Sequence, residues 1–226
     1  MRAVGQSASD IVDLPARRDS LHLSEIRRRI IAGGRGEDVM ISLIEPDAED
    51  QIRALKMGDM VHLTGVIYTG RDAVHKFLHE GGTPPVDLAG QIIYHCGPVV
   101  IKEKGRWVVK AAGPTTSIRE EPYQAHLIEK YTLRAVIGKG GMGPKTLEAC
   151  AKFGCVYLHA VGGAAQVLAE CVTDVLGVYL EEFGSPEAIW AFRVKDFPAV
   201  VTMDAHGNSL HATVLEQSTE RLKRLA

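Results

Sequence analysis

Residues 113–119 read Gly-Pro-Thr-Thr-Ser-Ile-Arg and lie between a hairpin-like pair of β-rich runs and a segment with helical periodicity. Pro114 has a fixed φ and disfavours a helical conformation of the residue before it, so the stretch begins extended. Three adjacent hydroxyls then precede a helix start, where free backbone N–H groups and the helix dipole favour an anion. Arg119 follows with a planar guanidinium that matches a carboxylate. The stretch is therefore a candidate anion-binding site, although a hydroxyl before a helix is also the ordinary N-cap.

The composition is that of an ordinary globular chain. Of the 226 residues, 46% are apolar and 24% are charged, and the formal net charge is −2. Aromatic residues make up 6% of the chain, too few to favour a base-stacking surface for nucleic acid. No apolar run reaches the roughly 20 residues that span a bilayer, and the N-terminus lacks the apolar stretch of a secretory signal. We therefore expect a cytoplasmic protein with no nucleic-acid or membrane partner.

The four cysteines, Cys96, Cys150, Cys155 and Cys171, lack the spacing of metal ligands. None belongs to a CxxC pair. Cys150 and Cys171 lie in apolar helical contexts and the other two in strand-like ones, so we expect small buried hydrophobic residues. Any metal cluster that works with this chain is then expected to take its ligands from another chain.

The chain is expected to divide into a basic extension and one larger domain. Residues 1–36 hold seven arginines against four acids, and apolar residues recur at helical spacing between residues 23 and 30. A glycine pair follows and would end that short helix. We assign residues 1–40 to the extension and residues 41–226 to the domain.

Alternating and helical hydrophobic patterns predict the elements of the domain. Strands are expected at residues 60–69, 91–101, 107–111, 133–137, 156–159, 172–179, 192–194 and 199–203. Helices are expected near residues 47–57, 73–78, 120–130, after Pro144, and at 164–171 and 214–225.

Arg71 lies just after the strand expected at residues 60–69 and at the start of a helix with an apolar stripe. Open α/β sheets bind ligands at such C-terminal strand ends. We interpret Asp72 as a favourable first-turn acid and His75 as a surface or packed histidine.

Residues 138–143 read Gly-Lys-Gly-Gly-Met-Gly and match GxGxxG between a strand and a helix. A dinucleotide site would also need an acid about 20 residues further on, but no acid lies between Glu148 and Glu170. A P-loop would need Ser or Thr after Lys139 and a different glycine spacing. What remains is a glycine-rich backbone nest with a lysine, suited to a small anion such as a carboxylate.

Taken together, five motifs resemble the beta subunit of the two-subunit class I, iron–sulfur-dependent fumarate hydratases and L-tartrate dehydratases. They are equally similar to the C-terminal domain of the single-chain enzymes, and the resemblance runs from about residue 41 to about residue 215. The motifs are Leu-Thr-Gly at 63–65 with Thr-Gly-Arg-Asp-Ala-Val-His-Lys at 69–76, then residues 113–119, residues 138–143, Gly-Gly-Ala-Ala at 162–165 and Asp-Ala-His-Gly-Asn at 204–208.

The resemblance implies a swivelling β/β/α domain, that is, an α/β fold with mixed β-sheet layers and flanking helices. It also implies an alpha subunit as partner, in a heterotetramer of two alpha and two beta chains. In that family a [4Fe–4S] cluster is held by cysteines of the alpha part, and one of its irons binds and polarises the substrate hydroxyl. The substrate lies between the two parts.

The resemblance also implies roles for five side chains. Arg71, Thr116, Arg119 and Lys139 fall on substrate-binding positions of the family, and Thr115 falls on its proposed catalytic base. Three cations suit the two carboxylates of a 2-hydroxydicarboxylate such as malate. A threonine hydroxyl is a weak base, so Thr115 would need nearby cations or a charged group of the partner.

The expected reaction is the reversible hydration of fumarate to L-malate. Gly-Gly-Ala-Ala at residues 162–165 resembles the fumarase segment, whereas tartrate dehydratases tend to carry a cysteine-containing variant. Two alternatives stay open: the beta subunit of an L-tartrate dehydratase, and a dicarboxylate-binding module without a catalytic partner.

Overall fold

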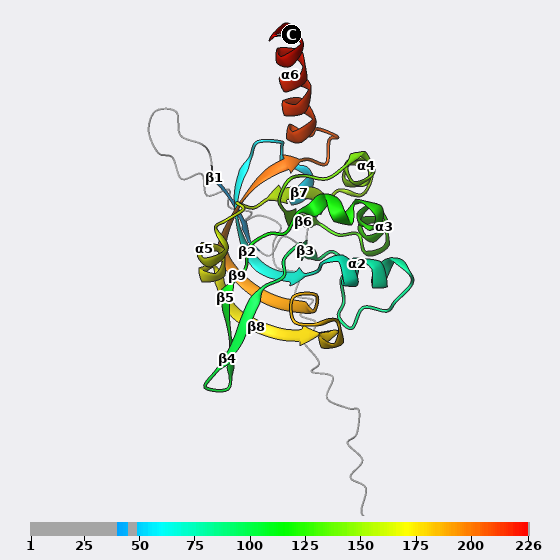
Figure 1. Cartoon of the computed structure of the whole chain (residues 1–226). Coiled ribbons are helices and arrows are strands. Elements are labelled where there is room, and N and C mark those ends of the chain that lie inside the picture. Colours follow the sequence, from blue (N-terminus) through cyan, green and yellow to red (C-terminus); the bar gives the residue numbers. More distant parts are fainter. Residues whose placement is uncertain (1–39, 45–48, 226) are drawn as a thin grey trace, which may run out of the picture.

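The computed structural model describes residues 40–44 and 49–225 (Figure 1). The extension of residues 1–40 and its short helix, apart from Met40, lie outside these residues. The strands are β1 (Met40–Ile44), β2 (Met60–Thr69), β3 (Ile92–Tyr94), β4 (Val99–Glu103), β5 (Arg106–Ala111), β6 (Ala135–Gly138), β7 (Val156–His159), β8 (Val172–Tyr179) and β9 (Ile189–Met203). The helices are α1 (Glu49–Arg53), α2 (Asp72–His79), α3 (Glu121–Tyr131), α4 (Pro144–Phe153), α5 (Ala165–Glu170) and α6 (Leu210–Leu225), with 3-10 turns η1 (Ser117–Glu120) and η2 (Glu181–Phe183).

The main sheet has the strand order β1-β2-β3-β6-β7-β9-β8. Strands β1, β2, β3, β6 and β7 run parallel to their neighbours, whereas β9 is antiparallel to β7, to β8 and also to β2. Because β9 pairs with both β2 and β7, the strands β2, β3, β6, β7 and β9 form a closed ring of pairings. Strands β4 and β5 form a separate hairpin. The expected α/β class with sheet layers and flanking helices is confirmed.

Both faces of the central strands are buried, which explains their continuous apolar sequence. Along β3, Ile92 and Tyr94 join one hydrophobic cluster and Ile93 the other, as the period of two in a strand requires. The second cluster contains the apolar sides of α2, α3 and α4, and Figure 1 shows these three helices on one side of the sheet. Helix α3 packs between the other two. These three helices therefore cover one face of the parallel strands (Figure 1).

Strand β9 differs from the prediction, which placed two short strands at 192–194 and 199–203. The structure has one strand of 15 residues. Pro198 cannot donate a hydrogen bond to a ladder, yet it lies within β9 opposite His62 of β2. A register shift opposite residues 63–65 of β2 accommodates the irregularity, and Asp196 has a positive φ of 52° there. The strand continues because pairing covers its whole length: β8 pairs along residues 189–194, β2 along residues 191–200 and β7 along residues 200–203.

The prediction of one strand at residues 91–101 is also wrong. The structure divides it into β3, which enters the main sheet, and β4, which pairs with β5. Between them lies Gly97-Pro98, where proline restricts the preceding residue and removes a ladder donor. By contrast, the strands predicted at 60–69, 156–159 and 172–179 are confirmed with the same bounds.

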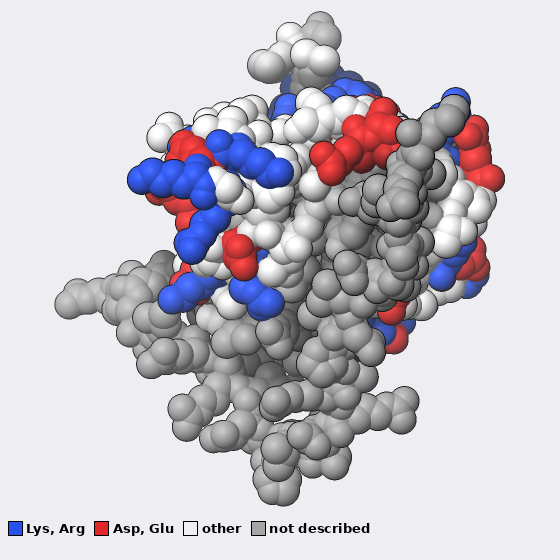
Figure 2. Space-filling model, turned by 90° about the horizontal axis from the view of Figure 1, so that it is seen from below, with Lys and Arg blue, Asp and Glu red and all other residues white. Residues whose placement is uncertain are grey.

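Charged side chains of both signs lie on the described surface (Figure 2). Figure 2 shows acidic and basic side chains interspersed over the described part of one face. Among the helices of residues 40–44 and 49–225, none combines the length and the apolarity needed to cross a membrane.

Candidate functional site

Residues 113–119 lie against the C-terminal ends of two parallel strands. The backbone N–H of Thr115 donates to the carbonyl oxygen of His95, just after β3, at 2.7 Å. The N–H of Ser117 donates to the carbonyl oxygen of Lys139, just after β6, at 3.0 Å. The stretch is thus fixed by backbone hydrogen bonds at the edge where α/β sheets commonly bind ligands.

Lys139 contacts two of the motifs that the sequence singled out. Its Nζ donates to Thr116 Oγ1 at 3.1 Å. A Cβ placed on Gly162 would lie 3.2 Å from Lys139 Cδ, so the glycine lets the lysine pass close to the Gly-Gly-Ala-Ala segment. The structure therefore brings Thr116, Lys139 and residues 162–165 together.

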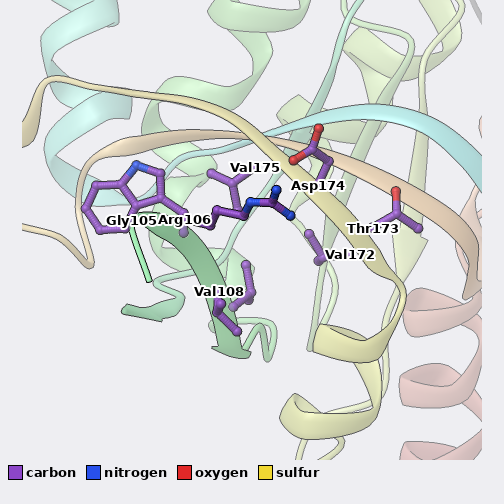
Figure 3. A pocket seen from close by; sticks show the side chains of 9 residues that line it. Gly105, Arg106, Val108, Val172, Thr173, Asp174 and Val175 are labelled. Atoms are coloured by element: carbon purple, nitrogen blue, oxygen red, sulfur yellow. The ribbon is translucent and has the colours of Figure 1, made fainter. Parts of the chain in front are cut away.

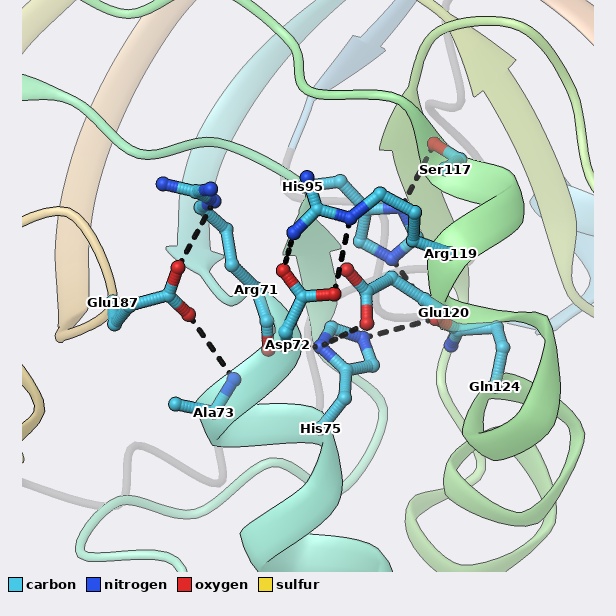
Figure 4. Close-up of polar contacts among 10 residues, drawn as sticks. All are labelled: Arg71, Asp72, Ala73, His75, His95, Ser117, Arg119, Glu120, Gln124 and Glu187. Carbon is cyan, nitrogen blue, oxygen red and sulfur yellow. Dashed lines mark hydrogen bonds and ion pairs between the residues drawn. The ribbon is translucent and has the colours of Figure 1, made fainter.

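Arg71 lies at the end of β2 and points towards Glu187, as Figure 4 shows. Its Nε is 3.3 Å from Glu187 Oε1, and the other oxygen of that carboxylate accepts a hydrogen bond from the N–H of Ala73 at 3.1 Å. A Cβ on Gly97 would lie 2.6 Å from Arg71 Nη1 and 2.8 Å from the fixed carbonyl oxygen of Pro186, so a glycine is needed there. Glu187 thus orients Arg71, a role that no sequence motif indicated.

Arg119 forms an ion pair with Asp72, the residue after Arg71. Nε of Arg119 donates to Asp72 Oδ1 at 3.1 Å, and a second guanidinium nitrogen contacts the other carboxylate oxygen. The side chains are 47% and 39% exposed, so the pair is weak and an incoming carboxylate can compete for the arginine. We call Arg71, Arg119 and Lys139 the cationic clamp.

A buried polar network lies behind Arg71 and Arg119 (Figure 4). Its members are fully buried or nearly so: Glu120, His75, Gln124, His95, Ser117 and Tyr157. Ser117 Oγ lies 2.8 Å from His95 Nδ1 and accepts a hydrogen bond from the Tyr157 hydroxyl at 2.8 Å. Ser117, expected to face an anion with the two threonines, is instead part of this interior network.

Two histidines of the network share Gln124. Its Oε1 lies 3.1 Å from His75 Nε2 and 2.9 Å from His95 Nε2, while its Nε2 has no partner among the described residues. His75 Nδ1 faces the carbonyl oxygen of Arg71 at 2.9 Å, so this nitrogen carries a proton. Turning the amide by 180° lets its NH₂ group donate to Nε2 of both neutral rings.

Burial controls the protonation of these groups. It lowers the pKa of His75, and it lowers the pKa of His95 well below the usual value, with a further contribution from His75. It raises the pKa of Glu120 to about 7, against the opposing effects of Arg119 and Arg71. The network therefore holds neutral imidazoles and an acid that titrates near neutrality.

At the end of the glycine-rich stretch of residues 138–143, a carboxylate of the chain itself occupies the start of α4. The carboxylate of Glu121 accepts hydrogen bonds from the N–H of Gly143 at 2.8 Å, of Lys145 at 3.0 Å and of Thr146 at 3.3 Å. The Thr146 hydroxyl donates to it as well, at 2.6 Å. Backbone N–H groups do bind a carboxylate here, but the anion is the chain's own Glu121 at the start of α4.

The turn at residues 204–208 is a structural element. Asp204 is 1% exposed and accepts hydrogen bonds from the N–H groups of Met57, His206 and Asn208 and from the Asn208 amide. Burial by itself would raise the pKa of Asp204, but the hydrogen bonds from Asn208, Met57 and His206 lower it. As expected from composition, this acid fixes a turn.

A cavity of about 730 Å³ lies apart from the clamp, between β5 and β8 (Figure 3). Its walls include Trp107, Val109, Val172 and Val175, with Arg106 and Asp174 as charged groups. None of the five predicted site residues lines it.

Metal-ligating side chains do not gather among the described residues. No group of three or more His, Cys, Asp or Glu side chains among residues 40–44 and 49–225 is placed to hold a metal ion. Cys96, Cys150 and Cys155 are buried and Cys171 is partly buried. Burial raises the pKa of Cys96 to about 12 and that of Cys155 well above the usual value, so these groups are thiols rather than the thiolates that bind iron. The described residues do not fit a [4Fe–4S] cluster.

The family model of the fumarase C-terminus matches residues 15–214, and the chain belongs to this family. The match begins at residue 15, within the segment predicted to be a basic extension. It includes the five predicted site residues and the whole buried network.

Three relatives give the range of similarity. A Geobacillus stearothermophilus protein provisionally named class I fumarate hydratase is 60% identical over 195 residues, which are 86% of this chain and 38% of that protein. The L(+)-tartrate dehydratase subunit beta of Escherichia coli K12 is 39% identical over 181 residues, 79% of this chain and 90% of the relative. A Methanocaldococcus jannaschii protein with the same name, given provisionally, is 42% identical over 180 residues, 77% of this chain and 92% of the relative. The chain thus spans well under half of the Geobacillus protein.

Proposed function

We propose that this chain is the beta-type part of a class I fumarate hydratase, which interconverts fumarate and L-malate. The observation that carries the proposal is the meeting of separate motifs at one sheet edge: Thr116 with Lys139, and Arg119 with the residue beside Arg71. Membership of the fumarase C-terminus family and 60% identity to a protein named as a fumarate hydratase support it.

The clamp suits the charge of a four-carbon dicarboxylate. Arg71 and Arg119 each provide a planar fork for a carboxylate, and Lys139 adds a point charge. In this proposal Asp72 and Glu187 hold the two arginines in place until the ligand arrives. Preorganised cations are most valuable where negative charge develops during reaction.

Dehydration of malate requires the removal of a proton from the carbon beside a carboxylate and the loss of the hydroxyl from the neighbouring carbon. The clamp would stabilise the negative charge that builds up on that carboxylate. We assign proton removal to Thr115, whose position is fixed by its backbone bond to His95. The hydroxyl would leave towards a [4Fe–4S] cluster, which supplies a Lewis acid and which we assign to an alpha partner.

The proposed assembly is a heterotetramer of two alpha and two beta chains in the cytoplasm. The names of the Escherichia coli and Methanocaldococcus relatives as subunits beta support a partner chain. Within this chain we keep residues 1–40 as an extension and residues 41–226 as the catalytic part.

A tartrate dehydratase is the second candidate, because two relatives with that name match over 90% and 92% of their length. Their identities of 39% and 42% are lower than the 60% found with the fumarate hydratase. Comparing kcat/KM of the assembled enzyme for L-malate and L-tartrate separates the two candidates.

The test uses the complex assembled anaerobically with the alpha chain. Arg119→Lys keeps the charge but loses the planar fork of the guanidinium. The value of kcat/KM should therefore fall roughly 10- to 150-fold, which is a loss of about 1.5–3 kcal/mol of transition-state stabilisation. Thr115→Ala should lower kcat more than it changes KM, because the lost interaction belongs mainly to the transition state. Arg224→Lys, on the exposed end of α6, is the matched control and should behave as wild type.

Three results would contradict the proposal. Full activity of Arg119→Lys would remove Arg119 from the clamp. A cluster bound stoichiometrically by this chain alone would contradict its assignment to the partner. Dicarboxylate binding without turnover in the complete complex would favour a non-catalytic binding module.

A further inference from the structure

Glu120 combines complete burial with a lack of hydrogen bonds. The residue is 0% exposed, and neither Oε1 nor Oε2 has a hydrogen-bond partner among the described residues. Burying a carboxylate without partners costs several kcal/mol, so an acid in this state is normally neutral or serves a function. The chain places this acid directly after Arg119, at the end of η1.

Charged and titratable groups face Glu120 from each element packed around it. Helix α2 and its N-cap contribute Arg71, Asp72 and His75, η1 contributes Arg119, the segment before β9 contributes Glu187, and Gln124 of α3 links the site to His95. His75 Nδ1 lies 3.8 Å from Glu120 Oε2. Figure 4 shows the Glu120 carboxyl between the His75 ring and the guanidinium of Arg119.

We propose that Glu120 is a proton-binding positioning residue of the clamp: its carboxyl takes up one proton from solvent when a dicarboxylate binds at Arg71 and Arg119, and returns it when the ligand leaves. The proposal rests on the proposed function for the identity of the ligand. The step is a simple protonation, in which a carboxylate oxygen forms an O–H bond and no other bond changes.

The physical reason is competition for two cations. In the free site, Arg119 and Arg71 favour the ionised form of Glu120, while burial opposes it and holds its pKa at about 7. A bound dicarboxylate occupies these arginines and adds negative charge, and both effects raise the pKa of Glu120 further. Burial lowers the pKa of His75, so the proton resides on Glu120 and not on the imidazole.

Proton binding at Glu120 and ligand binding at the arginines are thermodynamically linked, so each changes the affinity of the other by the same factor. If the ligand favours the protonated form, then protonation favours the ligand, and binding tightens as pH falls. Above the pKa of free Glu120, the dissociation constant should rise about tenfold per pH unit until the pKa of the complex is reached. The neutral form of Glu120 does not compete electrostatically with the ligand for Arg71 and Arg119.

The first experiment measures proton uptake by the assembled complex. Succinate is the probe, because it is a four-carbon dicarboxylate without the hydroxyl and does not turn over. Calorimetric titrations at pH 7.5 in phosphate and in Tris, whose ionisation enthalpies differ, should give an uptake of up to about 0.75 proton per succinate, because about a quarter of a group with a pKa of about 7 is already protonated at this pH. Glu120→Gln, which resembles the protonated acid, should show no uptake and a constant affinity between pH 6.5 and 8.5. Glu129→Gln, an exposed acid of α3, should match wild type.

The second experiment observes the acid directly by infrared difference spectroscopy. The full chain should show a protonated carboxylic acid band that titrates near neutrality, grows on addition of succinate at pH 7.5 and is absent from Glu120→Gln. Persistence of the band or of the proton uptake in Glu120→Gln would overturn the proposal. A complex that binds no succinate but keeps the titrating band would overturn the coupling and the proposed function, while the assignment of the proton to Glu120 would stand.

Discussion

Glu120 and Glu121 are neighbours in the sequence and have opposite environments in the fold. The carboxylate of Glu121 accepts four hydrogen bonds at the start of α4, three from backbone N–H groups and one from the Thr146 hydroxyl. The carboxyl of Glu120 accepts none from the described residues. One acid completes a helix N-terminus, and the other lies unpaired beside two arginines.

The difference shows how this chain separates a structural anion from a functional one. Free N–H groups at a helix start attract any carboxylate, and Glu121 occupies them permanently. The arginines near Glu120 are engaged by Glu187 and Asp72 through contacts that a ligand can replace. The anion site at the start of α4 is therefore occupied by the chain itself, whereas Arg71 and Arg119 can exchange their carboxylate partners for a ligand.

The largest effect is expected for Glu121→Ala. This variant leaves three backbone N–H groups and the Thr146 hydroxyl without their acceptor, and Thr146 is fully buried, so its unsatisfied donors are costly. The free energy of unfolding should fall by about 3 kcal/mol, measured by urea denaturation at pH 7. A loss below about 1 kcal/mol would mean that water replaces the carboxylate and that the nest is accessible.

Glu120→Gln should instead raise stability, in a pH-dependent way. The pKa of Glu120 is about 7 in the folded state against an ordinary value of 4.5, so the folded state binds more protons between these pH values. Stability of the wild type therefore falls as pH rises through this window, and the penalty is complete above pH 7. The variant lacks this penalty, which is about 3 kcal/mol for such a shift, but its buried amide costs part of that gain, so it should be more stable by about 2 kcal/mol at pH 8.

Urea denaturation of both proteins at pH 5 and pH 8 checks this prediction. The difference between variant and wild type should be small at pH 5 and should grow with pH. A constant difference would show that Glu120 does not change its protonation on folding, which would also remove the basis for proton-linked binding.

The smallest effect is expected for Glu129→Ala. Glu129 lies on α3 as well, but its contact with Lys152 is 3.8 Å long, and the side chains are 57% and 65% exposed. Exposed pairs of this kind contribute about 0–1 kcal/mol. Urea denaturation should show a change within about 0.5 kcal/mol, which makes this variant the reference for truncating an acid of this helix.

Strands β2, β7 and β8 could be predicted from the sequence. Their hydrophobic patterns involve only residues within each strand, so no knowledge of the partner strands was needed. The continuity of β9 was not predictable in this way. Pro198 and Asp196 indicate a break, and only pairing with three other strands keeps the segment extended. Likewise, the division of residues 91–101 depends on which partner strand each half meets.

The sequence by itself determined the fold class, the family and the order of the five motifs, because hydrophobic period, glycine and proline positions and motif residues are local properties. It also singled out the residues of the clamp. The tertiary structure decided which charges meet: Arg71 with Glu187, Arg119 with Asp72, and Glu121 with the glycine-rich nest. It also decided that Glu120 is buried and Glu129 is exposed, since burial depends on the packing of α3 between α2 and α4. Electrostatic function in this protein follows from those long-range contacts, because a pKa is set by the groups and the solvent around an acid and not by its neighbours in the chain.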